Sequence, residues 1–300
     1  MPLNFDKIKE YGSLELLAKQ MVEGFITGLH RSPYHGFSVE FAEHRLYNTG
    51  ESTRHIDWKV FAKTDRLYVK RYEEETNLRC QIVLDNSSSM YYPTDHSKIR
   101  FGILAAACLT YMLQKQRDAV GISVFSEQIE WQSPVKSTPS HLNYLLFELE
   151  KLLGNVPVQK KTATAEILHQ IADKIHKRSL VIIFSDMFNN LSGQDTLFAA
   201  LKHLKHRLHE VLLFHVHDQA TEMDFNFSDR PHEFIDLESN EKIRLMPSQI
   251  RSFYRQQTHD FYQNLKLKCG QFGIDWIEAD IGKNIDQILL PYLIKRSKMK

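Results

Sequence analysis

The stretch IVLDNSSSM, residues 82–90, decides how this chain folds and what it can bind. Its first letters close an apolar strand that runs from Arg79 to Asp85, and three consecutive serines, Ser87 to Ser89, follow at once. Ligands of open α/β sheets bind beyond the carboxyl ends of the strands, so this turn is a candidate site. Taken alone, the turn fits a nucleophile, a phosphate cradle, a cation site or an ordinary helix cap.

Outside this stretch, apolar strands alternate with amphipathic helices. We expect strands at residues 79–85, 118–126, 179–186, 210–218 and 274–280, helices at 98–116, 141–154, 164–178, 197–209 and 248–273, and a hairpin at 234–246. Such alternation is typical of a mostly parallel sheet with helices on both faces. The sequence therefore predicts a doubly wound α/β fold.

The pattern is different before residue 77. Residues 14–29 have helical spacing, residues 30–53 are rich in Gly, Pro and Ser, and residues 65–74 alternate as a half-exposed strand does. We expect residues 1–76 to form an N-terminal extension and residues 77–300 to form the main domain.

Composition narrows the function. The 300 residues are 42% hydrophobic and 25% charged, with a net charge of +1, which gives no whole-molecule field to attract nucleic acid. No apolar run reaches the roughly 20 residues of a membrane span, and the first residues lack the apolar core of a signal peptide. Three widely spaced cysteines indicate reduced thiols. We expect a cytoplasmic protein without membrane insertion.

The serine spacing points to a hard cation. Alternate side chains of a turn face the same way, so Asp85, Ser87 and Ser89 converge while Asn86 and Ser88 face away. Asp186 ends a second apolar strand. Carboxylate and hydroxyl oxygens are the ligands that Mg²⁺ prefers, with Mn²⁺ or Ca²⁺ as alternatives.

The string Asp85-x-Ser87-x-Ser89 resembles the first segment of the metal-ion-dependent adhesion site of von Willebrand factor A domains. That resemblance implies a threonine ligand from a later loop and an aspartate ligand from a later strand end. The loop KKTATAEIL offers Thr162, which the family's Gly-Thr-x-Thr pattern favours, or Thr164, and the strand end offers Asp186. Lys161 stands where the family commonly has glycine, so the choice between the threonines stays open.

The N-terminal part carries a second resemblance. The string Arg54-His55-Ile56-Asp57-Trp58-Lys59, with the following Tyr68-Val69-Lys70 strand and Glu73 to Glu75, resembles the signature of the bacterial proteins called domain of unknown function 58. In that family the segment leads directly into a von Willebrand A-like domain. Members are commonly associated with MoxR-type AAA+ ATPases, so the resemblance implies such a partner.

Other chemistries fit the sequence less well. The G-x-S-x-G elbow of serine hydrolases and the G-x-x-x-x-G-K-S/T phosphate loop are absent, and an aspartyl-phosphate enzyme would need an aspartate where Ser87 stands. His215, His217 and Asp218 end a strand as a conceivable transition-metal site without an assignable third ligand. We interpret Trp58 as a buried anchor held by an Arg54–Asp57 pair, with a docking surface as the alternative.

Together these observations predict a non-enzymatic adaptor that binds an acidic residue of a partner protein through a divalent cation. The expected ligands are Asp85, Ser87, Ser89, Thr162 and Asp186. Two alternatives remain open: a metal-dependent hydrolase that uses the same site, and a metal-free scaffold.

Overall fold

The computed structural model of the chain describes residues 13–28, 41–48, 53, 56–72, 78–154, 163–187 and 194–297. It divides into two compact units. The large unit comprises Met1–Thr27 and Leu78–Lys300, and the small unit comprises Gly28–Asn77. The expected division at residue 76 differs from this one, because the first helix is grouped with the large unit.

A six-stranded sheet forms the centre of the large unit. In spatial order its strands are β10 (Asp275–Asp280), β7 (Glu210–His217), β6 (Leu180–Ser185), β3 (Arg79–Asp85), β4 (Ala119–Phe125) and β5 (Ile129–Gln132). The first five are parallel, and β5 runs antiparallel to β4 at the edge. Strands β3, β4, β6 and β7 are almost wholly buried, which explains why they read as continuous apolar runs.

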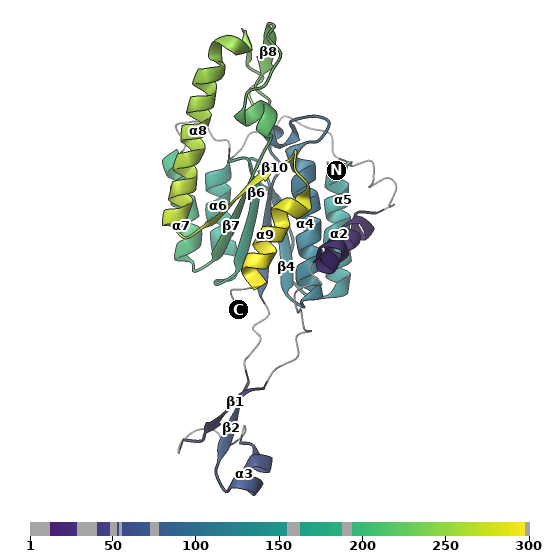
Figure 1. Cartoon of the computed structure of the whole chain (residues 1–300), viewed down its shortest axis with the longest axis vertical. Helices are drawn as coiled ribbons and strands as arrows, with labels where there is room; N and C mark the ends of the chain where they lie inside the picture. Colours follow the sequence, from purple (N-terminus) through teal and green to yellow (C-terminus); the bar gives the residue numbers. More distant parts are fainter. Residues whose placement is uncertain are drawn as a thin grey trace. The chain divides into compact units, whose positions relative to one another are not determined.

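Helices cover both faces of this sheet (Figure 1). One face packs against α2 (Leu14–Gly28), α4 (Lys98–Lys115), α5 (Pro139–Leu153) and α9 (Ile285–Ser297). The other packs against α6 (Thr164–Lys174), α7 (Gln194–His206) and α8 (Pro247–Gln271). Strand side chains alternate between the faces, so Ile182 and Phe184 join the first core and Val181 and Ile183 the second.

The mixed α/β prediction with a mostly parallel sheet is confirmed, and every strand and helix expected after residue 77 is present within a few residues. The edge strand β5 and helix α9 were not expected. Strand β5 has only four residues, and α9 contains Pro291, a residue that normally interrupts a helix.

All three cysteines are buried free thiols. Cys80 and Cys108 lie in the core on the α4 face of the sheet, and Cys269 lies in the core on the α8 face. Burial raises the pKa of Cys108 and of Cys269 to about 12. Among the described helices, none combines the length and apolarity that a membrane span requires.

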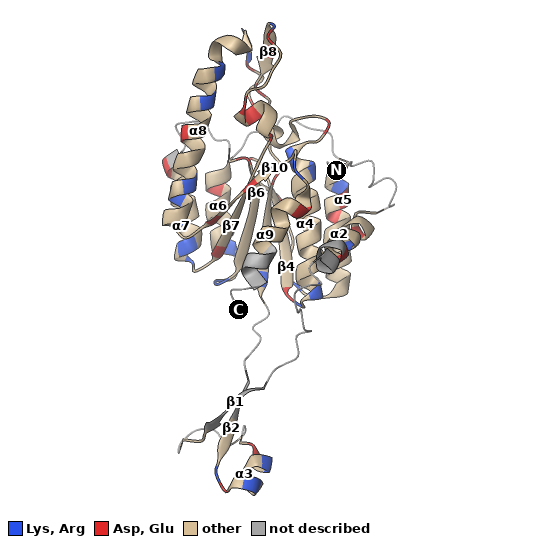
Figure 2. Cartoon of the chain, viewed as in Figure 1, with Lys and Arg blue, Asp and Glu red and all other residues tan. Residues whose placement is uncertain are grey.

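Residues 219–246 form an insertion between β7 and α8. It contains the short π-helical turn η4 (Gln219–Met223) and a hairpin of β8 (His232–Ile235) and β9 (Lys242–Leu245). Asn240, at φ 60°, lies in the turn that the sequence predicted. Lys and Arg residues are blue along α8 in Figure 2. Two arginines of α8 hold the insertion. Arg251 donates to the carbonyls of Phe225 and Phe227, and Arg255 pairs with Asp224.

The small unit contains β1 (Phe41–Leu46) and β2 (Tyr68–Tyr72), which pair antiparallel, and helix α3 (Trp58–Thr64). Asp57 caps α3, accepting hydrogen bonds from the backbone N–H groups of Lys59 and Val60. The prediction of a buried tryptophan is wrong. Trp58 is 59% exposed because it occupies the first turn of α3, where it contacts Phe61 edge to face. Arg54 and Glu73 to Glu75 lie outside the described residues.

Candidate functional site

The serine turn leaves the carboxyl end of β3 in the middle of the sheet. The backbone N–H of Ser87 donates to Oδ1 of Asp85 at 3.0 Å, and the hydroxyls of Ser87 and Ser89 lie 3.1 Å apart. Asn86 points elsewhere, because its amide donates to Glu130 at 2.9 Å and its carbonyl oxygen accepts from the Tyr91 hydroxyl at 2.8 Å. The predicted alternation of side chains along the turn is therefore confirmed for Ser87, Ser89 and Asn86.

The helix-cap interpretation of the serines is not supported. Ser87 precedes the 3₁₀ turn η2 (Ser88–Tyr91), but its side chain makes no capping hydrogen bond. Ser97 takes the same position before α4, also without a side-chain cap. The hydroxyls of Ser87 and Ser89 contact each other, so the role of this serine pair is not to satisfy a helix end.

The Asp85 carboxylate is fully buried beside the serine pair. It accepts a hydrogen bond of 2.6 Å from the hydroxyl of Ser185, the last residue of β6, which sequence reasoning had not singled out. Burial, and next the nearby charge of Asp186, raise the pKa of Asp85 to about 7, although its hydrogen bonds from Ser185 and Ser87 oppose the rise. Burial therefore favours the protonated form of this carboxyl.

The expected threonine ligand, Thr162, lies outside the described residues. Thr164, the alternative, is the first residue of α6 and is only 1% exposed. Its hydroxyl has no hydrogen-bond partner among the described residues. A buried polar atom without a partner costs free energy, so this hydroxyl is available to bind a ligand. Thr164, Ser89 and Asp186 line one end of the same cavity.

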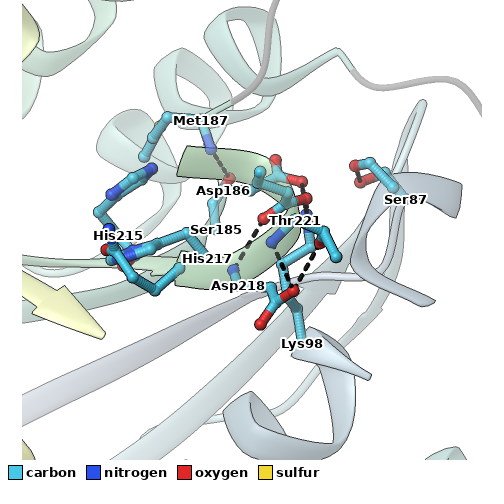
Figure 3. A network of polar contacts seen from close by, with 12 residues as sticks. Ser87, Lys98, Ser185, Asp186, Met187, His215, His217, Asp218 and Thr221 are labelled. Atoms are coloured by element: carbon cyan, nitrogen blue, oxygen red, sulfur yellow. Dashed lines mark hydrogen bonds and ion pairs between the residues drawn. The ribbon is translucent and has the colours of Figure 1, made fainter. Parts of the chain in front are cut away.

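Asp186 follows β6, as expected, but it already has a cationic partner. The ammonium of Lys98, the first residue of α4, donates to Oδ2 of Asp186 at 2.8 Å and also pairs with Glu222 of η4. Figure 3 shows Lys98 and Asp186 within one polar network with Asp218 and Thr221. Burial disfavours the charged form of Lys98, but Asp186 and Glu222 together outweigh it and raise the pKa of the ammonium. Lys98 is therefore a permanent internal cation.

Sequence reasoning missed Lys98 and Glu222. Lys98 lies 88 residues before Asp186 and 124 residues before Glu222, so no local spacing connects the three. One signal was available. Lys98 begins a helix in which Ile99, Phe101, Ile103 and Leu104 follow as apolar residues, and a lysine buried with them needs a counter-ion.

The residues present fit a small hard cation, apart from the competition of Lys98. Two oxygen ligands at right angles around Mg²⁺, each about 2.1 Å from it, are about 3 Å apart, and the Ser87 and Ser89 hydroxyls are 3.1 Å apart. Asp85 would supply the charge and Thr164 its unpartnered hydroxyl. No cluster of three or more His, Cys, Asp or Glu that could hold a metal occurs among the described residues.

The His215–His217 pair has a different environment. Both side chains are buried, and their rings stack with centroids 4.8 Å apart. Nδ1 of His217 contacts the carbonyl of His215, while the His215 ring packs against Tyr262 and Trp276. Burial, with the charges of His217 and Lys98, holds the pKa of His215 well below its usual value. Both histidines are therefore core residues packed against aromatic rings. Asp218 instead caps η4 by accepting from Thr221.

The family model described as "Protein of unknown function DUF58" matches residues 43–263. Among curated relatives, "Uncharacterized protein Rv1480" of Mycobacterium tuberculosis and "Uncharacterized protein Mb1516" of Mycobacterium bovis are each 25% identical over 207 residues. The match covers 69% of this chain and 63% of each relative. The chain thus spans less than two thirds of the length of these relatives.

Two solved structures show distant likeness. One is the conserved hypothetical protein BatB from Bacteroides thetaiotaomicron, with a TM-score of 0.45 and 16% identity over 74% of this chain and all of that one. The other is an aerotolerance-related membrane protein from Bacteroides fragilis, with a TM-score of 0.39 and 16% identity over 68% of this chain and 90% of that one.

Proposed function

This chain belongs to the family described as "Protein of unknown function DUF58", and on the geometry of its serine turn we propose that it is a protein-binding module that depends on a divalent cation and has no catalytic activity. The observation that carries the proposal is the set of hydroxyls and the carboxylate at the end of β3. Ser87, Ser89 and Thr164 would hold the cation together with Asp85. Asp186 would join them when it is released from Lys98.

The chemistry of this ligand set favours binding over hydrolysis. Hydroxyls carry no charge, so a bound cation would keep net positive character and an open position for an acidic side chain of a partner. Mg²⁺ is the expected ion, since it accepts oxygen ligands and retains coordinated water. The position of Ser89, Thr164 and Asp186 at the wall of a cavity supports access by such a side chain.

The proposal includes a fold type and a partner class. The Asp-x-Ser-x-Ser turn at the end of a central parallel strand supports a von Willebrand A-type arrangement of the sheet. Through the resemblance of residues 54–75 and the serine turn to proteins associated with MoxR-type AAA+ ATPases, we also propose such an ATPase as a working partner of this chain.

A metal-free scaffold is the second candidate, and Lys98 favours it. Its ammonium already pairs with both Asp186 and Glu222, so these carboxylates have a buried positive partner without any metal. In that case the carboxylates would serve stability, and partner binding would not respond to chelators.

Calorimetric titration of chelator-stripped protein with Mg²⁺ and Mn²⁺ separates the two candidates. We expect saturable binding to the wild type and at least a 100-fold loss in Asp85→Ala, on the order of the largest effects seen when a group that supports a metal ligand is removed. Asp95→Ala is the matched control, because Asp95 is an exposed aspartate shortly after the same turn. Binding that survives in Asp85→Ala would refute the site, and saturable binding to neither protein would favour the scaffold.

A further inference from the structure

The cavity that borders the candidate cation site extends far beyond it. Its volume is about 770 Å³. Ser89, Thr164 and Asp186 line it beside the serine turn, and the rest of its lining includes β8, the turn after β8, and Tyr254, Thr258 and Tyr262 from the middle of α8. A peptide segment bound in this cavity can therefore contact both the cation site and the insertion.

The wall on the insertion side is an aromatic cluster. Phe225 stacks on Phe234 with ring centroids 5.4 Å apart and on Tyr254 at 4.4 Å, and Phe227 meets Phe234 edge to face at 5.0 Å. Arg251 of α8 donates to the carbonyls of Phe225 and Phe227, which fixes the segment that carries these rings. The cluster is a packed apolar surface suited to an aliphatic or aromatic side chain.

The shape of the cavity suits an extended chain. Seven consecutive residues line it, from His232 through β8 to Glu238. Successive side chains of a strand point to opposite faces, so a cavity lined by all of them follows the edge of the strand. In the part of the chain that the structure describes, β8 pairs with β9 along one edge and its other edge is unpaired. An unpaired edge offers backbone N–H and C=O groups to an added strand.

The charge of the lining is acidic. Six of its residues are carboxylic acids and none is Lys or Arg: Glu166, Asp186, Glu222, Glu233, Asp236 and Glu238. The single ammonium of Lys98 pairs with both Asp186 and Glu222, and Arg244 pairs with Glu233.

Two of these acids, Glu166 and Asp236, are exposed and have no cationic partner among the described residues. The Ser239 hydroxyl and the Glu238 N–H hold the pKa of Asp236 below its usual value, so this residue stays ionised. The lining therefore offers two free negative charges to a basic ligand.

We propose that this cavity binds an extended segment of a partner protein that carries a lysine or arginine beside an apolar side chain and that adds as a strand to the free edge of β8. The basic group lies between Asp236 and Glu166, and the apolar side chain packs on the Phe225–Phe234 cluster. The inference rests on the proposed function in one respect: an acidic residue of the same segment reaches the cation at Ser87 and Ser89.

A random dodecapeptide library displayed on phage and selected on the full chain in Mg²⁺ tests the proposal. We expect the selected peptides to be enriched in Lys or Arg next to apolar residues. Their synthetic versions should bind about tenfold more weakly to the double variant Asp236→Lys, Glu166→Lys, because both rim charges are reversed. Both residues are exposed, but the Asp236 carboxylate also accepts hydrogen bonds from Ser239 and from the Glu238 N–H. The milder pair Asp236→Asn, Glu166→Gln keeps a side-chain acceptor in this turn and should weaken binding in the same direction. Glu150→Lys, an exposed acid on α5, is the control and should bind unchanged.

Strand addition has its own measurement. N-methylation of alternate amides of a selected peptide removes donors to the β8 edge and should weaken binding at least tenfold in one register and little in the other. The proposal is overturned if selection yields no basic enrichment or no peptides at all, or if the double variant and the wild type bind the peptides equally.

The cation dependence separates this inference from the proposed function. Peptide binding that is lost in Asp85→Ala but unchanged in the double variant would support the proposed function and overturn the inference. Binding that is lost in the double variant but indifferent to chelator would support the groove and refute the cation site.

Discussion

At the scale of single residues, the site depends on how buried charges are shared. Lys98, Asp186 and Glu222 form a chain of ion pairs from three elements, and only Glu222 has appreciable exposure. Removing one member of a buried ion pair leaves the other without compensation, which costs far more than the pair contributes. A divalent cation bound at the proposed site would therefore compete with the Lys98 ammonium for Asp186.

The Lys98→Met variant tests this competition. Without metal, we expect the free energy of unfolding to fall by about 3–5 kcal/mol, because Asp186 and Glu222 lose their counter-ion. With Mg²⁺, part of that loss should be recovered and the ion should bind more tightly than to the wild type. Urea unfolding with chelator and with Mg²⁺ measures both effects. Lys115→Met, at the exposed end of the same helix, is the control, and equal Mg²⁺ responses in all three proteins would contradict the competition.

Asp85 gives a prediction about pH. Its pKa in the folded protein is raised from 3.8 to about 7, so the fold favours the protonated carboxyl. The resulting stability is complete below about pH 4 and is lost as the pH rises through 7. Asp85→Asn carries no charge at any pH. In the presence of a chelator, the free energy of unfolding of Asp85→Asn should exceed that of the wild type. The difference should grow between pH 4 and 7 and level off at roughly 4 kcal/mol.

Urea unfolding at pH 5 and pH 8 measures this difference. A gap of the same size at both values would show that burial does not perturb Asp85. Added Mg²⁺ should stabilise the wild type at pH 8 and leave Asp85→Asn unaffected.

At this scale, the sequence predicted the local geometry but not the distant partners. The alternation of Ser87 and Ser89 against Asn86 follows from backbone geometry within one turn, and it was confirmed. Lys98 and Ser185 reach Asp186 and Asp85 only through the fold. Contacts between side chains about 90 to 100 residues apart leave no periodic signal in a single sequence.

At the scale of elements, periodicity predicted the parallel strands and the amphipathic helices because burial on both faces requires apolar runs. Periodicity failed for elements that are too short for a pattern or that depend on their end caps. The four residues of β5 are too short for a pattern, and α3 begins at an exposed tryptophan whose bulk suggested a core position. Helix α3 instead depends on its ends, with Asp57 as N-cap and Asp65 as C-cap.

The two ends of α3 give opposite predictions. Asp57→Ala removes the acceptor of two backbone N–H groups and should destabilise the helix by about 1 kcal/mol. Asp65 has φ 57°, a left-handed conformation that glycine adopts without strain, so Asp65→Gly should be neutral or stabilising. Hydrogen exchange of the α3 amides reports both changes. Faster exchange in Asp65→Gly than in Asp57→Ala would contradict this account of the caps.

At the scale of the whole molecule, the unexpected feature is that the first helix, α2, belongs to the large unit. Leu14, Leu17, Ala18 and Val22 are buried in the core on the α4 face, although some 50 residues separate α2 from β3. The sequence predicted the helix but not its partner, since an amphipathic face does not say which surface covers it.

Substitutions on α2 test this arrangement. Leu14→Ala and Leu17→Ala should each lower the free energy of unfolding of the large unit by about 2–5 kcal/mol, as buried leucines do. Leu16→Ala, on the same helix but 40% exposed, should change it by less than about 1 kcal/mol. Equal effects of the buried and exposed substitutions on the unfolding of the large unit would assign α2 to a separate extension.

Because buried cysteines lie on both faces of the central sheet, the rate of thiol modification can be measured for each face separately. Cys108 is a buried residue of α4 and Cys269 a buried residue of α8. Burial raises the pKa of each thiol to about 12, so neither is readily ionised while it stays buried. The rate at which a maleimide modifies each thiol therefore reports how often its side of the sheet opens. Tryptic mass mapping of the modified chain would distinguish opening of the α8 side, where the insertion is anchored, from opening of the α4 side, without introducing any probe into the sequence.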